Sequence, residues 1–199
     1  MRKSYFNLIC GIVILSVLFT ACSQDRSQYA ELFTQVEKHR AVFTQPLEDG
    51  LAALGIADAV GEYDTTLGTI MQDDILTVNE MEFIQQITAD VANGVIVGYR
   101  IGTVFPRSES GYEHARELVH AFLDHYKPAD AKEAEKVKKS VQSIDRMALP
   151  LLPLTGSIEE LWTCGEGENN LFITYRIANS FENDEELPLN LYFSSEAQP

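Results

Sequence analysis

Three of the four histidines lie within twelve residues of one predicted helix, together with two acidic side chains. The set is His114, Glu117, His120, Asp124 and His125. Glu117 and His120 have the Glu-x-x-His spacing that places two ligands on one helix face in carboxylate-bridged metal sites. Such a site needs a second pair of this kind and two further carboxylates, and the sequence has no second Glu-x-x-His. Glu117 and His120 are therefore candidate metal ligands, and a solvated polar face is the alternative.

Two acidic turns are candidates for binding a cation or a cationic ligand. One contains Glu166 and Glu168, and the other contains Asp184 and Glu185. Neither has the alternating Asp or Asn ligands, central Gly and terminal Glu of an EF-hand loop. Turns that only increase solubility are the alternative for both segments.

The N-terminus carries a signal that concerns location rather than chemistry. Two basic residues, Arg2 and Lys3, precede an almost wholly apolar run at 8–19, which is short for a membrane span and typical of a signal peptide. Two small residues and Cys22 follow this run. This arrangement resembles the lipobox of bacterial lipoproteins, with Phe19 in the place usually held by Leu.

The resemblance implies cleavage before Cys22 and a covalent diacylglycerol on its sulfur, usually with a third chain on the new amino group. Two chains already anchor a protein stably, because each buried CH₂ contributes about 0.8 kcal/mol. Ser23, rather than Asp, follows the cysteine, which in similar families favours the outer membrane, here facing the periplasm. We therefore expect a signal peptide at 1–21, a lipidated tether at 22–28 and a single globular domain at 29–199.

The mature chain would keep only one thiol, at Cys164, because Cys10 leaves with the signal peptide and Cys22 is lipidated. Glu166 and Glu168 lie close in sequence and should raise the pKa of this thiol, which disfavours a nucleophilic role. The sequence also lacks a phosphate loop, a Cys-x-x-Cys pair and a His-Glu-x-x-His helix. It therefore assigns no catalytic residue, predicts no cofactor beyond the lipid on Cys22, and favours a non-enzymatic protein.

Charge narrows the class of partner. Removal of Arg2 and Lys3 leaves 13 basic against 30 acidic residues, a formal charge of −17, so phosphate-rich partners such as nucleic acid are excluded. We expect an anchored envelope lipoprotein that binds a cationic partner protein or ligand. The alternatives are an envelope hydrolase or metal-dependent enzyme that uses the 114–125 helix, and an inhibitor or immunity-type protein.

An internal repeat indicates the fold class. The stretch at 95–105, VIVGYRIGTVF, returns 76 residues later at 171–181 as LFITYRIANSF. We predict an α+β fold with a small antiparallel sheet, built from two equivalent hairpin-like units at about 83–105 and 160–181. A C-terminal edge strand at 187–193 contains Pro188, which suits an edge position. A mainly α-helical bundle with a C-terminal β element is the alternative, because 81–105 also has a helical pattern.

Three to four helices should pack on that sheet. Apolar spacing and proline positions predict helices from Tyr29 to before Pro46, over about 47–56, from Ser110 to before Pro128, and from Asp130 to before Pro150. The segment 58–79 is predicted to be mostly loop.

The lipid anchor can be tested directly. Cys22→Ser removes the only sulfur to which a lipobox-type lipid would attach, so we expect loss of metabolic palmitate labelling and of membrane association. Cell fractionation with radiolabelled palmitate measures both, and Cys164→Ser is the matched control that should retain them. Equal labelling of the Cys22→Ser protein would contradict the lipoprotein assignment.

Overall fold

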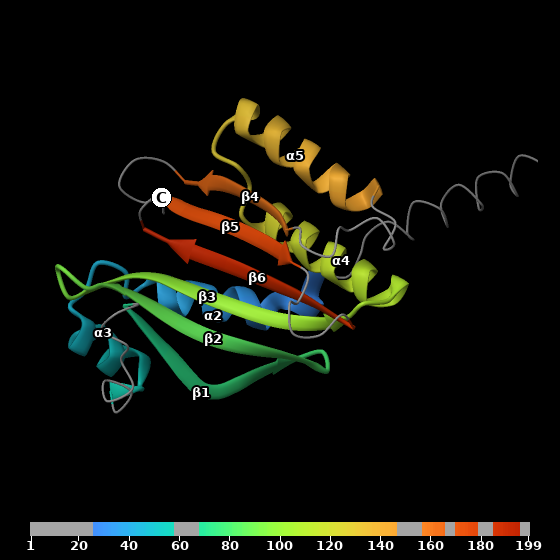
Figure 1. The fold of residues 1–199 in the computed structure, drawn as a ribbon. Helices are drawn as coiled ribbons and strands as arrows, with labels where there is room; N and C mark the ends of the chain where they lie inside the picture. The colour runs from blue at the N-terminus through green and yellow to red at the C-terminus, as the bar shows by residue number, and fades with distance from the viewer. Residues whose placement is uncertain (1–25, 58–67, 147–156, 166–169, 179–184, 196–199) are drawn as a thin grey trace, which may run out of the picture.

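A computed structural model describes residues 26–57, 68–146, 157–165, 170–178 and 185–195. Within them, one six-stranded antiparallel sheet has the strand order β1-β2-β3-β6-β5-β4, and helices cover one of its faces (Figure 1). This arrangement confirms the α+β fold class. The elements are η1 (Arg26–Tyr29), α2 (Ala30–Arg40), α3 (Leu47–Leu54), β1 (Thr69–Val78), β2 (Met81–Asp90), β3 (Val95–Pro106), α4 (Glu109–His125), α5 (Ala131–Arg146), β4 (Ser157–Cys164), β5 (Leu171–Ala178) and β6 (Glu186–Ser194).

The chain order contains the same unit twice. A pair of helices precedes three consecutive antiparallel strands in each half, first α2 and α3 before β1–β3, then α4 and α5 before β4–β6. The strands β1 and β4 begin 88 residues apart, at Thr69 and Ser157, and β3 and β6 also end 88 residues apart. Antiparallel pairing of β3 with β6 joins the two halves into one sheet.

The sequence repeat located two hairpins correctly but related the wrong strands. Both predicted hairpins exist, as β2 with β3 and as β4 with β5. The 76-residue offset, however, equates β3, the third strand of its half, with β5, the middle strand of the other half. The two are not equivalent in the sheet, so their similar sequences reflect the same need for alternating buried side chains.

The predicted C-terminal edge strand is wrong in position, because β6 lies at the centre of the sheet between β3 and β5. Pro188 is tolerated there for a local reason. It stands opposite Val104 on β3, whereas the ladder with β5 has its last pair at Ile177 and Leu189. Pro188 therefore lies where β6 is paired on one side only, and its missing N–H breaks no ladder bond.

Two other expectations are corrected by the strands of the first half. Residues 69–78 form β1 rather than loop, and 95–106 form β3, which excludes the helical-bundle alternative. A bulge in β3 shifts its register against β2 between Gly98 and Ile96, so Ile96 is buried and Val95 and Val97 are only half-buried.

The helices bury one face each against the sheet. In α2 the buried positions are Leu32, Phe33, Val36 and His39, which share one helical face. Ser108, two residues before the predicted start at Ser110, accepts a hydrogen bond from the Gly111 N–H at the start of α4. The predicted start of α5 at Asp130 is correct, since Asp130 accepts a hydrogen bond from the Glu133 N–H at 2.8 Å and caps the helix.

A buried histidine connects α2 to the sheet. The His39 ring stacks on Tyr99 with 3.8 Å between centroids. Its Nδ1 lies 2.8 Å from the Gln35 carbonyl oxygen and its Nε2 lies 2.9 Å from the Gln72 amide nitrogen. Nδ1 therefore donates and Nε2 accepts, as in a neutral imidazole. Burial lowers the pKa of His39 from 6.5 to about 4.

This histidine predicts an acid-sensitive stability. Because the pKa in the folded chain lies below the unfolded value of 6.5, the unfolded chain binds more protons between pH 6.5 and about 4. The free energy of unfolding should therefore have its full value above pH 6.5 and decrease by about 3 kcal/mol as the pH falls toward 4. Urea denaturation at pH 7.5 and pH 4.5 measures the loss. His39→Phe retains the ring stack and should show a smaller pH dependence; an unchanged dependence would contradict the assignment.

Candidate functional site

The second face of the sheet is not covered by a described helix, and in Figure 1 the strands pass in front of α2 and α4. Cross-strand pairs place Gln86, Arg100 and Tyr192 in one row of this open face. The next row contains Ile84, Gly102 and Asn190. Since paired residues of antiparallel strands point to the same side, these side chains share a surface opposite the core.

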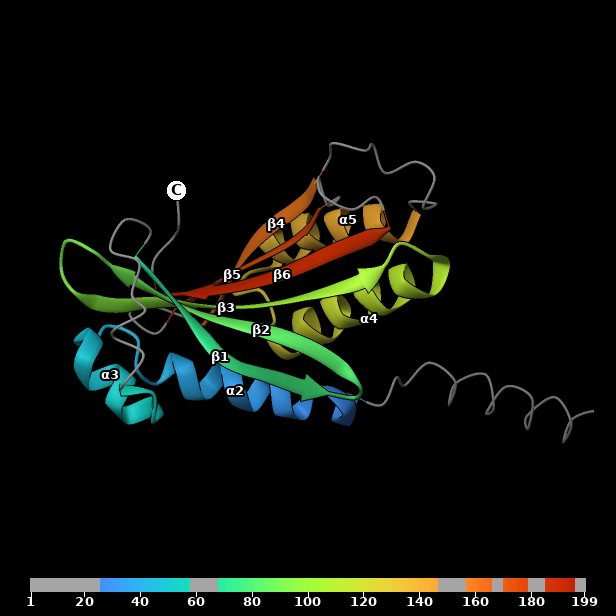
Figure 2. The same cartoon turned by 60° about the horizontal axis from the view of Figure 1, so that its bottom comes forward.

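A groove begins where β2 and β3 separate. Their ladder stops at the pair Ile84 and Gly102, although β3 continues to Pro106 and β2 begins at Met81. Figure 2 shows the two strands diverging toward the end of β3 that leads into α4. The groove at this point has a volume of about 560 Å³ and reaches from the open face to His114 on α4. We call it the β2–β3 groove.

Exposed apolar side chains gather in this groove. Five large hydrophobic side chains are exposed in the described residues, and three of them line it: Ile75 at 57%, Val104 at 50% and Ile84 at 47%. Met81, Phe105, Pro106 and Pro188 complete the apolar wall. A concentration of this kind marks a binding surface more often than a scatter of single residues does.

An irregularity in β1 brings Ile75 to the groove. Between the pairs Gln72–Gln85 and Leu76–Phe83, β1 contains three residues and β2 contains one. The two extra residues form a bulge, and bulges next to binding sites redirect side chains. Gln85 holds it from the core side: its side-chain nitrogen donates to the Asp74 carbonyl at 3.1 Å, and its oxygen accepts from the Tyr99 hydroxyl at 2.7 Å.

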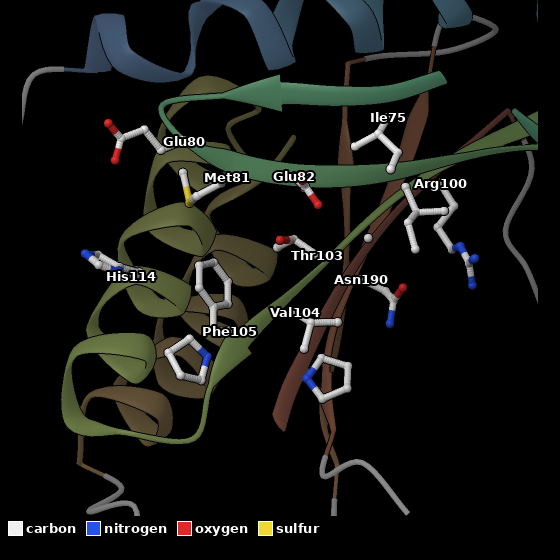
Figure 3. Close-up of a pocket in the computed structure, with 14 residues that line it drawn as sticks. Ile75, Glu80, Met81, Glu82, Arg100, Thr103, Val104, Phe105, His114 and Asn190 are labelled. Atoms are coloured by element: carbon white, nitrogen blue, oxygen red, sulfur yellow. The ribbon is translucent and has the colours of Figure 1, made fainter. Parts of the chain in front are cut away.

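Charged groups of both signs border the groove, as Figure 3 shows. Glu80 lies with Met81 and His114 toward one end, and Arg100 lies with Asn190 toward the other. Glu82 lies between the ends. Glu80 has φ of 65°, a left-handed conformation that is uncommon outside glycine and costs on the order of 1 kcal/mol.

Arg100 is held by the sheet but keeps an unsatisfied donor. Its guanidinium carbon lies 6.0 Å from the centre of the Tyr192 ring, within cation–π range. Its Nε is buried and has no hydrogen-bond partner in the described part of the chain. Gly102 leaves room beside it, since a Cβ there would stand 2.6 Å from the Asn190 side-chain oxygen. A larger residue at this position on β3 would displace the Asn190 side chain.

The histidine helix does not assemble the proposed metal ligands. Among the described residues no three His, Cys, Asp or Glu side chains form a group that could hold a metal ion. Glu117 and His120 are both half-buried on α4. His125 stacks on Phe33 at 4.0 Å between ring centroids, and burial lowers its pKa. His114 alone reaches the β2–β3 groove, where it lies beside Phe105.

The acidic-turn candidates fall mostly outside the described residues. Glu166, Glu168 and Asp184 lie outside the residues that the structure describes. Glu185 is exposed, and its carbonyl accepts a hydrogen bond from the Arg107 N–H at 2.6 Å. This bond extends the pairing of β3 with β6, so the backbone of Glu185 has a structural role.

Cys164 ends β4 as a half-buried free thiol. Its pKa is raised, as the sequence predicted, but chiefly by burial. The carboxylates of Glu37 and Glu133 add to the increase, and Arg40 opposes it. The charged groups that act on the thiol therefore come from the helices, and they could not be identified from their distance to Cys164 along the sequence.

Each copy of the repeat carries one arginine, which lies next to a buried tyrosine in the sequence. Arg100 and Arg176 point to the open face, while Tyr99 and Tyr175 are buried in the core. Arg176 lies 3.7 Å from the Glu159 carboxylate on the neighbouring strand β4.

Sequence reasoning missed most of the groove residues, although two of them gave a signal. Ile84 and Val104 are apolar residues at positions whose neighbours on both sides face the core, so an alternating strand places them outward. Glu80, Glu82 and Asn190 gave no signal, because the β1 bulge and the early end of the ladder bring them to the groove.

Comparisons with known proteins return no match to a family model, to a curated protein or to a solved structure. None of the helices in the described ranges is long and apolar enough to cross a membrane.

The role of Gln85 can be tested with its neighbour as control. Gln85→Leu leaves the Tyr99 hydroxyl and the Asp74 carbonyl without their partners, so the free energy of unfolding should fall by about 1–3 kcal/mol. Gln86→Leu, on the open face, should cost less than about 0.5 kcal/mol. Chemical denaturation measures both, and equal losses would show that Gln85 does not anchor the bulge.

Proposed function

We propose that this protein is a lipid-anchored envelope binding protein whose β2–β3 groove captures an extended segment of a partner protein. The segment carries apolar side chains and at least one basic residue. The observation that carries the proposal is the gathering of Ile75, Ile84 and Val104 in one groove on the uncovered face of the sheet. Burying apolar side chains against these three would contribute about 25 cal/mol per Å².

Charge complementarity supports a basic partner. Glu80 and Glu82 border the groove, and Arg100, the opposing charge, stands over the Tyr192 ring at the other end. The chain as a whole has a formal charge of −15, or −17 after loss of the signal peptide. Such a field speeds the encounter with a cationic segment, and the two carboxylates would fix its position on arrival.

The position of the tether supports a partner at the membrane. The Gln28 carbonyl accepts a hydrogen bond from the Asn79 side chain, and Asn79 precedes Glu80 in the turn at the groove. Five residues lie between Cys22 and Gln28, and the six steps from one to the other span at most about 22 Å when fully extended. A lipid on Cys22 would therefore hold the groove close to the membrane surface, within reach of membrane proteins.

Site-specific photocrosslinking in native envelopes tests this function. A benzoylphenylalanine replaces Val104 in the groove or, as the control, Val91, which is equally exposed at 54% but lies outside the groove. We expect a protein adduct from position 104 alone. Mass spectrometry should locate the crosslink in a segment with an apolar residue next to Lys or Arg, and Glu80→Gln with Glu82→Gln should reduce the yield.

Any of the following outcomes would overturn the proposal. The adduct forms equally from positions 104 and 91, or its mass corresponds to two copies of this chain, or the crosslinked species is a lipid. A crosslinked protein segment without basic residues would also contradict the assigned chemistry.

A further inference from the structure

We infer that the partner segment binds by β-strand addition, through main-chain hydrogen bonds to Val104 of β3 and Glu82 of β2. The inference rests on the proposed function and specifies how the same groove recognises its ligand. It follows from the direction in which backbone groups point along the two strands.

Two hydrogen bonds fix that direction for β3. The Arg107 N–H donates to the Glu185 carbonyl at 2.6 Å, and the Ser195 N–H donates to the Val97 carbonyl at 3.0 Å. Both belong to the β3–β6 register, so from Val97 onward the odd-numbered residues of β3 direct their N–H and C=O groups to β6. Successive residues of a strand alternate, and Val104 therefore directs both of its groups toward β2.

The same reasoning applies to β2. The Ala89 N–H donates to the Gly68 carbonyl at 2.7 Å, in register with the β1–β2 ladder, so the odd-numbered residues of β2 face β1. Glu82 accordingly directs its N–H and C=O toward β3. A regular ladder would pair it with Val104, but the ladder ends two residue pairs earlier, at Ile84 and Gly102.

The outer edge of β4, at one side of the sheet, is protected, whereas the gap between β2 and β3 is open. On β4, the Thr163 N–H donates to the Glu133 carboxylate and the Thr163 carbonyl accepts from the Ala129 N–H, both at 2.8 Å. A strand edge covered in this way cannot recruit another strand. On the sides that face each other, Glu82 and Val104 are not joined by the β2–β3 ladder, and both residues line the groove.

An extended segment satisfies both features of the groove. Its backbone pairs with Val104 on one side and Glu82 on the other, while its alternate side chains contact Ile75, Ile84 and the Val104 side chain. Main-chain bonds supply binding that does not depend on the partner's sequence. The apolar wall and the Glu80 and Glu82 carboxylates select apolar and basic side chains.

The test uses the full-length protein in detergent and a pool of nine-residue peptides with blocked termini, in which Val, Ile, Leu or Phe alternate with Lys, Ser or Thr. We expect retention of a subset of the pool. N-methylation of single residues in the tightest binder should weaken it about tenfold at positions whose N–H faces Val104 or Glu82, and little elsewhere.

Hydrogen exchange gives a second readout. In the free protein the Val104 amide should exchange faster than those of Thr103 and Phe105, which face β6, and peptide binding should slow it at least tenfold. The amide of Val91, outside the groove, should not change.

The failures of the two proposals are distinguishable. If crosslinking from position 104 succeeds but no peptide is retained, or every N-methylated form binds equally, or Val104 exchange is unchanged, strand addition is wrong and the groove recognises side chains alone. If position 104 also gives no specific adduct, the proposed function fails with it.

Discussion

The pairing of β3 with β6 is the contact on which the rest of the fold depends. Nine consecutive residue pairs, from Gly98–Ser194 to Pro106–Glu186, join two three-stranded units into one sheet. The pairing brings Tyr99 and Phe193 together on the covered face, where rings from α2 and α4 pack over them. Two separate three-stranded units would lose the contact between these two rings. The helices lie on one side because this shared apolar layer is there, and the other side is left for binding.

The sequence predicted the helices and strands better than it predicted how they are arranged in the sheet. Alternation and proline positions predicted the β2–β3 and β4–β5 hairpins, the C-terminal end of α4 and the start of α5, because these depend on local pattern and capping. The position of β6 depends instead on which strand offers it an unpaired edge, after the helices α4 and α5 have followed β3 in the chain. Pro188 suggested an edge, but a central strand tolerates it because the β5–β6 ladder has its last pair at Ile177 and Leu189. The similar motifs at 95–105 and 171–181 share a buried Tyr and a buried Ile, at 99 and 101 and at 175 and 177, but their strands hold different positions in the sheet.

The candidate site was predictable only in part, for a related reason. Side chains chosen for their chemistry, such as Glu117, His120 and Cys164, sit at helix faces and a strand end where packing and solvation account for them. The groove depends on an insertion in β1 and on a ladder that stops early, and neither follows from residue types. Ile84 and Val104 could have been found, since they are apolar residues at strand positions where the alternation predicts an exposed, polar side chain. Such local conflicts are expected where a protein binds something.

The second half of the chain indicates that the fold does not itself require the gap. With the 88-residue correspondence between halves, Val104 on β3 matches Tyr192 on β6. Tyr192 is paired with Thr174 on β5, and that ladder continues to Ser194 and Phe172. The β4–β5 ladder also runs without a register shift, whereas β1 carries two extra residues opposite β2. At this position the strands are therefore paired in the second half of the chain and separated in the first. The opening coincides with the β1 bulge, the left-handed Glu80 and the exposed apolar side chains, which is why we assign binding to this end of the sheet rather than to the open face as a whole.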